Sequence, residues 1–137
     1  ASSRLPVFGR VESVAALEMP AAIDNAGSPQ TYVLVHLQEE YLAACVRLGF
    51  KLDELASRYD QVKFLSVPAS EASAKIDPAT LPMLIAYQDG KYLASAERVG
   101  KEHGERLTAA HVEAAVLHLG VRLTSSATMR ETSSGAS

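Results

Sequence analysis

Residues Thr31–Leu37 (TYVLVHL) form an almost unbroken run of β-branched and aliphatic side chains. A strand with one face in water alternates apolar and polar residues, and this run does not. A continuous run is typical of a strand covered on both faces, as in a parallel sheet. Parallel strands are joined by crossovers, usually helices. The run therefore predicts an α/β domain with helices on both faces of the sheet.

Strand-like and helix-like patterns alternate along the rest of the chain. We expect strands at Val7–Val14, Thr31–Leu37, Gln61–Pro68, Met83–Gln88 and Lys91–Ala96. We expect helices at Ala15–Ala26 (broken early by Pro20), at Glu39–Tyr59, and from Thr108 to about Gly120, with a short helical or irregular crossover at Ala69–Lys75. The order β-α-β-α-β-(α)-β-β-α implies a mixed central sheet between two helix layers.

Three local signals fix the ends of elements in the second half of the chain. Asp89-Gly90 suits a type I′ turn, which requires positive φ at both central residues, and predicts a hairpin. Thr108 is a suitable N-cap for the last helix, because its hydroxyl can accept a backbone N–H. Gly120 stands where a left-handed C-cap residue is expected.

Composition bounds the class of protein. The chain has 137 residues, which suits one domain, and a formal net charge of −3, which argues against a nucleic-acid ligand. No apolar run approaches the roughly 18 residues of a membrane span, and the first ten residues lack a signal-peptide core. The single Cys45 cannot form an internal disulfide. We expect a cytoplasmic protein.

The end of the chain differs from the rest. Thr124–Ser137 carries five Ser and three Thr, with Met129 as its only sizeable apolar side chain. Such a segment cannot bury enough apolar surface to offset the entropy of ordering it. We therefore predict one folded domain over residues 1–123 and a disordered tail over residues 124–137.

The segment Leu81–Lys91 (LPMLIAYQDGK) resembles the thioredoxin fold, in which a cis proline opens a strand of the final hairpin. The alternative is an ordinary trans proline at the first position of a strand, which any fold allows. Together with the preceding strand order, the resemblance favours a thioredoxin-like α/β fold. It predicts that the Leu81–Pro82 bond is cis.

The residues that thiol–disulfide exchange requires are incomplete. The reaction needs a nucleophilic thiolate at the start of a helix and a resolving cysteine three residues later. Cys45 falls at the resolving position, but Leu42 stands where the nucleophile would be, and His36 occupies the place of the buried acid found in thioredoxins. We therefore expect no enzyme, with Cys45 as a buried apolar side chain and His36 as a hydrogen-bonded strand residue. A single-cysteine thiol oxidoreductase is the enzymatic alternative.

Several longer segments resemble the phosducin family. Thr31–Cys45 (TYVLVHLQEEYLAAC) is similar to the family's "VVHLYE…C", and Leu55–Ala72 (LASRYDQVKFLSVPASEA) to "LA..YP.VKF.KI.AS". Phe8–Val11 resembles the family's entry strand, and Leu107–Gly120 its closing helix. The resemblance spans about Val7–Val121, and its structural signature is His36, Cys45 and Pro82.

The chain departs from the family in two places. Gln38 stands where an aromatic residue is usual, and Glu40–Ala44 lacks the usual Gly or Pro. Phosducins also carry a long helical N-terminal region, and nothing before Arg4 could supply it. We expect an excised C-terminal domain or a reduced relative.

The resemblance implies a non-catalytic interaction module that binds the βγ dimer of heterotrimeric G proteins as a signalling regulator, or that helps the cytosolic chaperonin CCT to fold the β subunit. Other branches of the family suggest a chaperonin cofactor for actin or tubulin instead. In either case the partner is a protein, and no cofactor is implied.

Two loops are candidates for partner contact, because binding residues often lie on loops of a rigid frame. Gln38–Ala44 replaces the redox motif and contains Glu39 and Glu40, and Glu97–Arg106 carries Arg98, Lys101 and Arg106. We expect the second segment to be a solvated loop. His111 and His118 lie seven residues apart with no further ligand to complete a site, so we expect surface or packing roles for them and no metal.

Overall fold

The computed structural model describes residues 5–127. Its strands are β1 (Val11–Ser13), β2 (Tyr32–Gln38), β3 (Lys63–Pro68), β4 (Met83–Gln88) and β5 (Lys91–Ala96). Its α-helices are α1 (Met19–Asp24), α2 (Ala43–Arg58), α3 (Ala69–Ala72) and α4 (Ala109–His118). Three 3-10 helices are η1 (Ala16–Glu18), η2 (Pro78–Thr80) and η3 (Lys101–Arg106). The predicted order of elements is confirmed.

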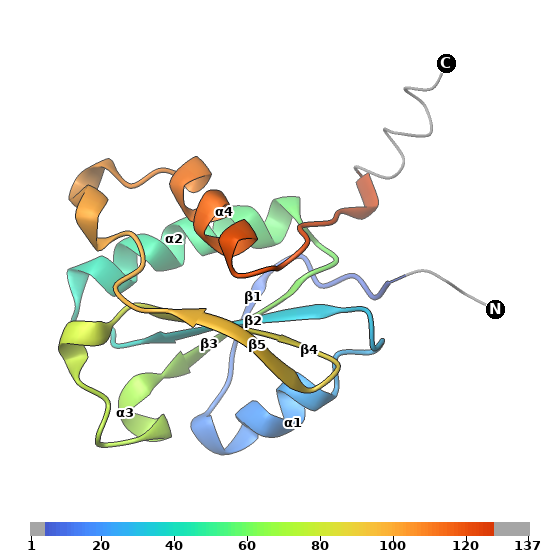
Figure 1. The fold of residues 1–137 in the computed structure, drawn as a ribbon, viewed down its shortest axis with the longest axis horizontal. Helices are drawn as coiled ribbons and strands as arrows, with labels where there is room; N and C mark the ends of the chain where they lie inside the picture. Colours follow the sequence, from blue (N-terminus) through green and yellow to red (C-terminus); the bar gives the residue numbers. More distant parts are fainter. Residues whose placement is uncertain (1–4, 128–137) are drawn as a thin grey trace.

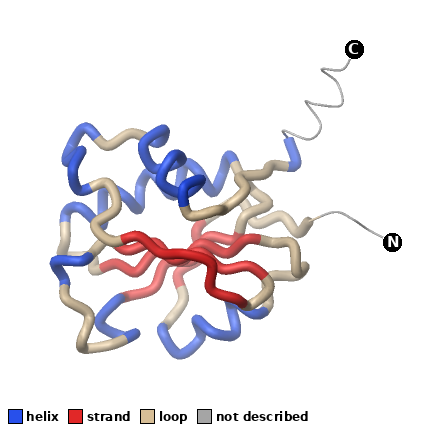
Figure 2. Tube along the Cα trace, in the orientation of Figure 1, coloured by secondary structure: helices blue, strands red, loops and turns tan. Residues whose placement is uncertain are grey.

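The strands form one mixed sheet in the order β1-β3-β2-β4-β5. β1 and β2 both run parallel to β3, whereas β4 runs antiparallel to β2 and to β5. Helices α2 and α4 lie on one face of the sheet, and α1 and α3 lie on the other (Figure 1). Figure 2 shows the strands as a single layer between the two helix layers. The predicted thioredoxin-like mixed sheet is therefore confirmed.

The central strand β2 contributes to a separate apolar cluster on each face. Leu34 packs with Phe64 and with the buried faces of α2 and α4. Val33, Val35 and Leu37 pack with the elements of the opposite face. Because successive side chains of a strand point to opposite faces, the apolar run of β2 supplies both clusters at once.

The N-terminal elements are shorter than predicted. The expected strand Val7–Val14 is reduced to β1, because Gly9 has a φ of +84°, which interrupts extended backbone. The expected helix Ala15–Ala26 becomes η1 followed by α1. Pro20 does not break it: the proline lies in the first turn of α1, where its missing N–H has no helical partner to lose.

Other boundaries also differ from the prediction. α2 begins at Ala43, four residues after Glu39, and Leu42 is its N-cap residue without a side-chain cap. β3 begins at Lys63, two residues after Gln61, and the expected crossover Ala69–Lys75 contains only α3. The segment Glu97–Arg106, expected to be a loop, contains η3.

The predicted ends of β4, β5 and α4 are confirmed. Asp89 and Gly90 both have positive φ, +54° and +72°, as a type I′ turn requires. The Thr108 hydroxyl accepts the His111 N–H at 3.1 Å. Gly120 has a φ of +90°, which is the left-handed conformation expected of it.

A buried lysine ties α1 to the sheet. Lys63 is buried at the start of β3, and its ammonium donates to the carbonyl oxygens of Ala22 and Asn25 at 2.7 and 3.0 Å. These carbonyls lie at the C-terminal end of α1, where they lack helical partners and where the helix dipole favours a cation. The same ammonium lies 6.0 Å from the centre of the Phe8 ring. One side chain thus satisfies the end of a short helix.

The predicted tail begins inside the described region. The Asp60 carboxylate accepts both the backbone N–H and the hydroxyl of Ser126 at 2.9 Å, and the Gln61 N–H donates to the Thr124 carbonyl. Residues 124–127 thus contact the loop between α2 and β3. The remainder of the predicted tail lies outside the described residues. No helix within residues 5–127 combines the length and the apolar character that crossing a membrane requires.

The fold predicts opposite effects of one substitution at two glycines. Gly49 lies inside α2, and a Cβ built there meets no atom within 4 Å. Gly49→Ala should therefore raise the free energy of unfolding by about 1 kcal/mol, because alanine loses less backbone entropy in a helix. A Cβ built at Gly120 also meets no atom within 4 Å, but the backbone of Gly120 is left-handed. Gly120→Ala should therefore lower the free energy of unfolding by about 1–2 kcal/mol. Urea unfolding of both variants measures the two changes in the free energy of unfolding, and changes of the same sign would contradict this account.

Candidate functional site

The residues that replace the redox motif lie at one end of the sheet, which we call the motif end: residues 38–45, Leu81–Pro82 and residues 97–106. The Leu81–Pro82 bond is cis, as predicted, and Pro82 is buried. Its carbonyl accepts the Val99 N–H at 2.9 Å, and the Thr80 carbonyl accepts the Arg98 N–H at 2.9 Å. These bonds fix residues 97–99 beside the start of β4.

Cys45 lies in the first turn of α2, buried among apolar side chains. It is 2% exposed and packs in the same cluster as Val35 and Leu37. Burial raises the pKa of the Cys45 thiol, because desolvation disfavours the thiolate. Leu42 occupies the helix position where a nucleophilic cysteine would have to stand. The described residues therefore place Leu42 at the start of α2 and leave Cys45 buried, with its neutral thiol favoured over the thiolate.

The two candidate contact loops are brought to the same end of the domain. Glu39 and Lys101 are both close enough to Cys45 to act on its thiol electrostatically. Lys101 Nζ also donates to the Ala79 carbonyl at 3.4 Å, which joins η3 to η2. In Figure 1 the start of α2, η2 and η3 (orange) lie on the same side of the molecule. The sequence predicts Gln38–Ala44 and Glu97–Arg106 as two candidate loops, and the structure places both at the motif end.

The five predicted contact residues differ in how they are held. Glu39 is half-buried and accepts the Ser70 hydroxyl at 3.2 Å, whereas Glu40 is exposed. Arg98 and Lys101 are exposed, and Arg98 has a φ of +51°. Arg106 is exposed at the end of η3. Three cationic side chains are therefore presented to solvent on a segment whose backbone is fixed.

His36 lies in β2 on the face of α2 and is 3% exposed. The sequence predicted a hydrogen-bonded histidine, and this is wrong for Nε2, which is buried without a partner among the described residues. Burial lowers the pKa of His36 from 6.5 to about 4, since no counter-charge offsets the desolvation of the imidazolium. The ring is therefore neutral at pH 7.

A histidine pair near the motif end was not anticipated. The rings of His103 in η3 and His111 in α4 stack in parallel, with centroids 3.6 Å apart. His111 Nδ1 accepts the Thr108 N–H at 3.1 Å, which completes a reciprocal cap at the start of α4. The Thr-x-x-His spacing was the available signal, because it follows the capping-box pattern with histidine in place of Glu or Gln. Within residues 5–127, no three His, Cys, Asp or Glu side chains gather as metal ligands.

Solved structures with this arrangement define the class of fold. Spinach chloroplast thioredoxin f superposes with a TM-score of 0.63, covering 86% of this chain and 100% of that structure at 13% identity. A Plasmodium falciparum thioredoxin superposes with a TM-score of 0.57, covering 78% of this chain and 97% of that structure at 15% identity. The domain therefore has the thioredoxin fold.

The sequence model of the phosducin family matches residues 3–130, so the chain belongs to the phosducin family. Phosducin-like protein 1 of Dictyostelium discoideum is 34% identical over 98 residues, which are 72% of this chain and 31% of that protein. Human phosducin is 29% identical over 93 residues, which are 66% of this chain and 38% of that protein. The aligned region is about a third of the length of these relatives.

The burial of Cys45 predicts that its thiol reacts slowly with alkylating reagents. Iodoacetamide at pH 7 should modify the native protein at least about 100-fold more slowly than the urea-unfolded chain, because the reaction requires local opening of a packed helix. Mass spectrometry at timed intervals measures both rates, and the unfolded chain is the internal control. Comparable rates would restore the oxidoreductase alternative.

The burial of His36 predicts a loss of stability in acid. Its folded pKa of about 4 lies below the 6.5 of the free side chain, so the unfolded chain binds more protons between these values. When the pH is lowered from 7 to 5, this residue should therefore lower the free energy of unfolding by about 2 kcal/mol.

Urea unfolding of wild type and His36→Gln at both pH values isolates this effect. The variant should lose that part of the pH dependence, whereas His118→Gln, which removes an exposed histidine, should keep it. An unchanged pH dependence in His36→Gln would show that the ring is protonated or partnered in the folded state.

Proposed function

We propose that this domain is a non-catalytic interaction module that binds the βγ dimer of heterotrimeric G proteins through the motif end, as a cytoplasmic regulator or as a co-chaperone of the cytosolic chaperonin CCT. The observation that carries the proposal is a phosducin-family chain in which the redox position holds Leu42 and a buried Cys45. A scaffold that keeps this geometry without a nucleophile acts through its surface.

The charge of the motif end supports a polar protein contact. Arg98, Lys101 and Arg106 are exposed on a segment held by backbone hydrogen bonds. The same segment also exposes Glu97, Glu102 and Glu105, and preorganised charges of both signs can direct encounter with a complementary surface and raise the association rate. The region also offers few apolar side chains, so the contact has the composition of a reversible interface and not of an obligate one.

A second candidate function is assistance to CCT in folding actin or tubulin. The observation that favours it is a similarity to phosducin-like protein 3 of Danio rerio, 27% identical over 88 residues. Purified βγ dimer, CCT, actin and tubulin, each tested against the immobilised full chain, separate the two. Binding of βγ alone or of βγ with CCT supports the first, and CCT with actin or tubulin but not βγ supports the second.

If the motif end is the contact surface, the affinity for βγ should depend on its exposed cations. The triple variant Arg98→Glu, Lys101→Glu, Arg106→Glu should weaken binding to βγ and flatten its salt dependence, because exposed ion pairs are screened by salt. Wild-type affinity should be micromolar or weaker, about −8 kcal/mol or less favourable. Isothermal titration at several ionic strengths provides both quantities.

The matched control reverses three exposed cations outside the motif end, Arg10, Lys91 and Arg122. This variant changes the net charge equally, so it should lose only the general part of the electrostatic attraction. Equal losses in both triple variants would exclude the motif end as the binding surface.

A further inference from the structure

The segment η3 carries charged residues of the motif end, yet no residue of η3 is buried. The residues on either side of it are anchored instead. Val99 and Leu107 are each 7% exposed and pack in the apolar cluster that contains the buried faces of α2 and α4. η3 therefore spans two anchored residues, and it exposes four charged side chains: Lys101, Glu102, Glu105 and Arg106.

The backbone of η3 forms its hydrogen bonds locally. The Lys101 N–H donates to the Arg98 carbonyl at 3.1 Å. The Leu107 N–H donates to the Gly104 carbonyl at 3.2 Å. Gly104 interrupts the helix with a φ of +54°, a conformation that favours glycine. Because glycine loses the most backbone entropy on ordering, these local bonds by themselves hold the segment weakly.

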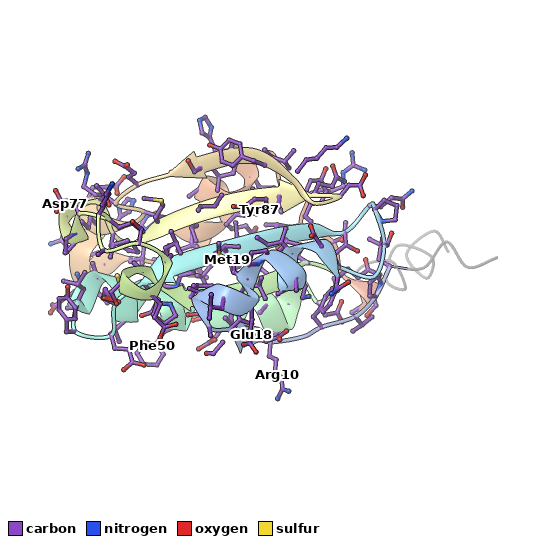
Figure 3. The ribbon with its side chains drawn as sticks, turned by 90° about the horizontal axis from the view of Figure 1, so that it is seen from below. Arg10, Glu18, Met19, Phe50, Asp77 and Tyr87 are labelled. Atoms are coloured by element: carbon purple, nitrogen blue, oxygen red, sulfur yellow. The ribbon has the colours of Figure 1, made fainter. Side chains whose placement is uncertain are left out.

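Lys101 and His103 connect η3 to neighbouring elements. Lys101 Nζ donates to the Ala79 carbonyl of η2 at 3.4 Å, which is long for a hydrogen bond. Asp77, the N-cap residue of η2, marks this end of the molecule in Figure 3. The ring of His103 lies parallel to that of His111 in α4, with 3.6 Å between centroids and 6° between planes. The ring stack is therefore the better formed of these two contacts.

The His111 ring is held in place by the first turn of α4. Its Nδ1 accepts the Thr108 N–H, and the Thr108 hydroxyl accepts the His111 N–H, both at 3.1 Å. This reciprocal cap fixes the plane of the ring, because the lone pair of Nδ1 lies in that plane and must point at its donor. His111 therefore offers a fixed flat face on which the His103 ring packs.

We propose that the stack of His103 on His111 positions the motif end: it orders η3 and so holds its charged side chains in the arrangement that a protein partner contacts. The ordering of η3 is a property of the free domain. Its effect on affinity rests on the proposed function, because a partner binds more tightly to a surface whose ordering cost is already met. Both histidines are positioning residues.

Amide hydrogen exchange of the free full chain, followed by NMR, tests the ordering. His103→Ala removes one ring and leaves the cap of α4 intact. The Lys101 and Leu107 amides should then exchange about fivefold faster, as expected for the loss of one ring contact. The Val99 amide donates to the Pro82 carbonyl, outside η3. It is the internal control, and its exchange rate should be unchanged.

Further variants separate the stack from the individual side chains. His111→Gln removes the other ring but keeps a capping acceptor in α4, so it should reproduce the effect of His103→Ala. The double variant should exchange no faster than either single variant, because both remove the same contact. His103→Phe restores a flat ring without imidazole nitrogens and should return the rates to within about twofold of wild type. His118→Gln removes an exposed histidine of α4 and should have no effect.

Titration of the βγ dimer into the same variants tests the consequence for binding. His103→Ala should raise the Kd about fivefold, because η3 and its side chains must then be ordered on binding. The dependence of the Kd on salt should stay as in wild type, since every charge of η3 is still present. A variant with reversed charges flattens this dependence instead, which distinguishes positioning from charge. His103→Phe should bind as the wild type does.

Thermal unfolding confirms that each variant is folded before its rates are compared. Three results would overturn the proposal: unchanged exchange of the Lys101 and Leu107 amides in both single variants, no recovery in His103→Phe, or an unchanged Kd in variants whose exchange has accelerated. If wild type does not bind βγ while both single variants exchange faster and His103→Phe recovers, the proposed function fails and the ordering role of the stack is supported. The two proposals therefore fail separately.

Discussion

The burial of β2 on both faces is the constraint on which the rest of this structure depends. Its backbone pairs with β3 on one side and β4 on the other, and its side chains enter both apolar clusters. A strand in this position can satisfy its polar groups only within the sheet, so the neighbouring strands and both helix layers must be in place. The end of β2 then fixes where residues 38–45 and the start of α2 lie.

The motif end keeps the backbone frame of the thioredoxin fold and differs in its side chains. The cis Pro82, the strand–loop–helix connection and the first turn of α2 keep their places. The chemistry is removed by Leu42 and by burial of Cys45, whose thiol is stabilised in its neutral form. The loops on this frame carry the exposed charges that we propose for partner contact.

His36 is a buried polar residue of β2. It continues the α2 face of β2 after Leu34, but as a polar residue in a row with Ser66 and Ser13. A groove of about 250 Å³ between α2 and β1 is lined by residues of this row and by Gly49 and Phe50 of α2.

The sequence by itself determined the features that depend on a residue and its near neighbours. The two-sided β2, the type I′ turn at Asp89-Gly90, the Thr108 cap and the left-handed Gly120 are local, because backbone preferences and side-chain periodicity express them within a few positions. The resemblance to the thioredoxin fold added the cis Pro82 and the place of Cys45. Tertiary structure alone decided the start of α2, the length of β1, the convergence of Glu39 and Lys101, the burial of Lys63 under α1 and the unpartnered His36. Each of these depends on contacts between residues distant in the chain, and such contacts form only when the sheet and both helix layers have assembled.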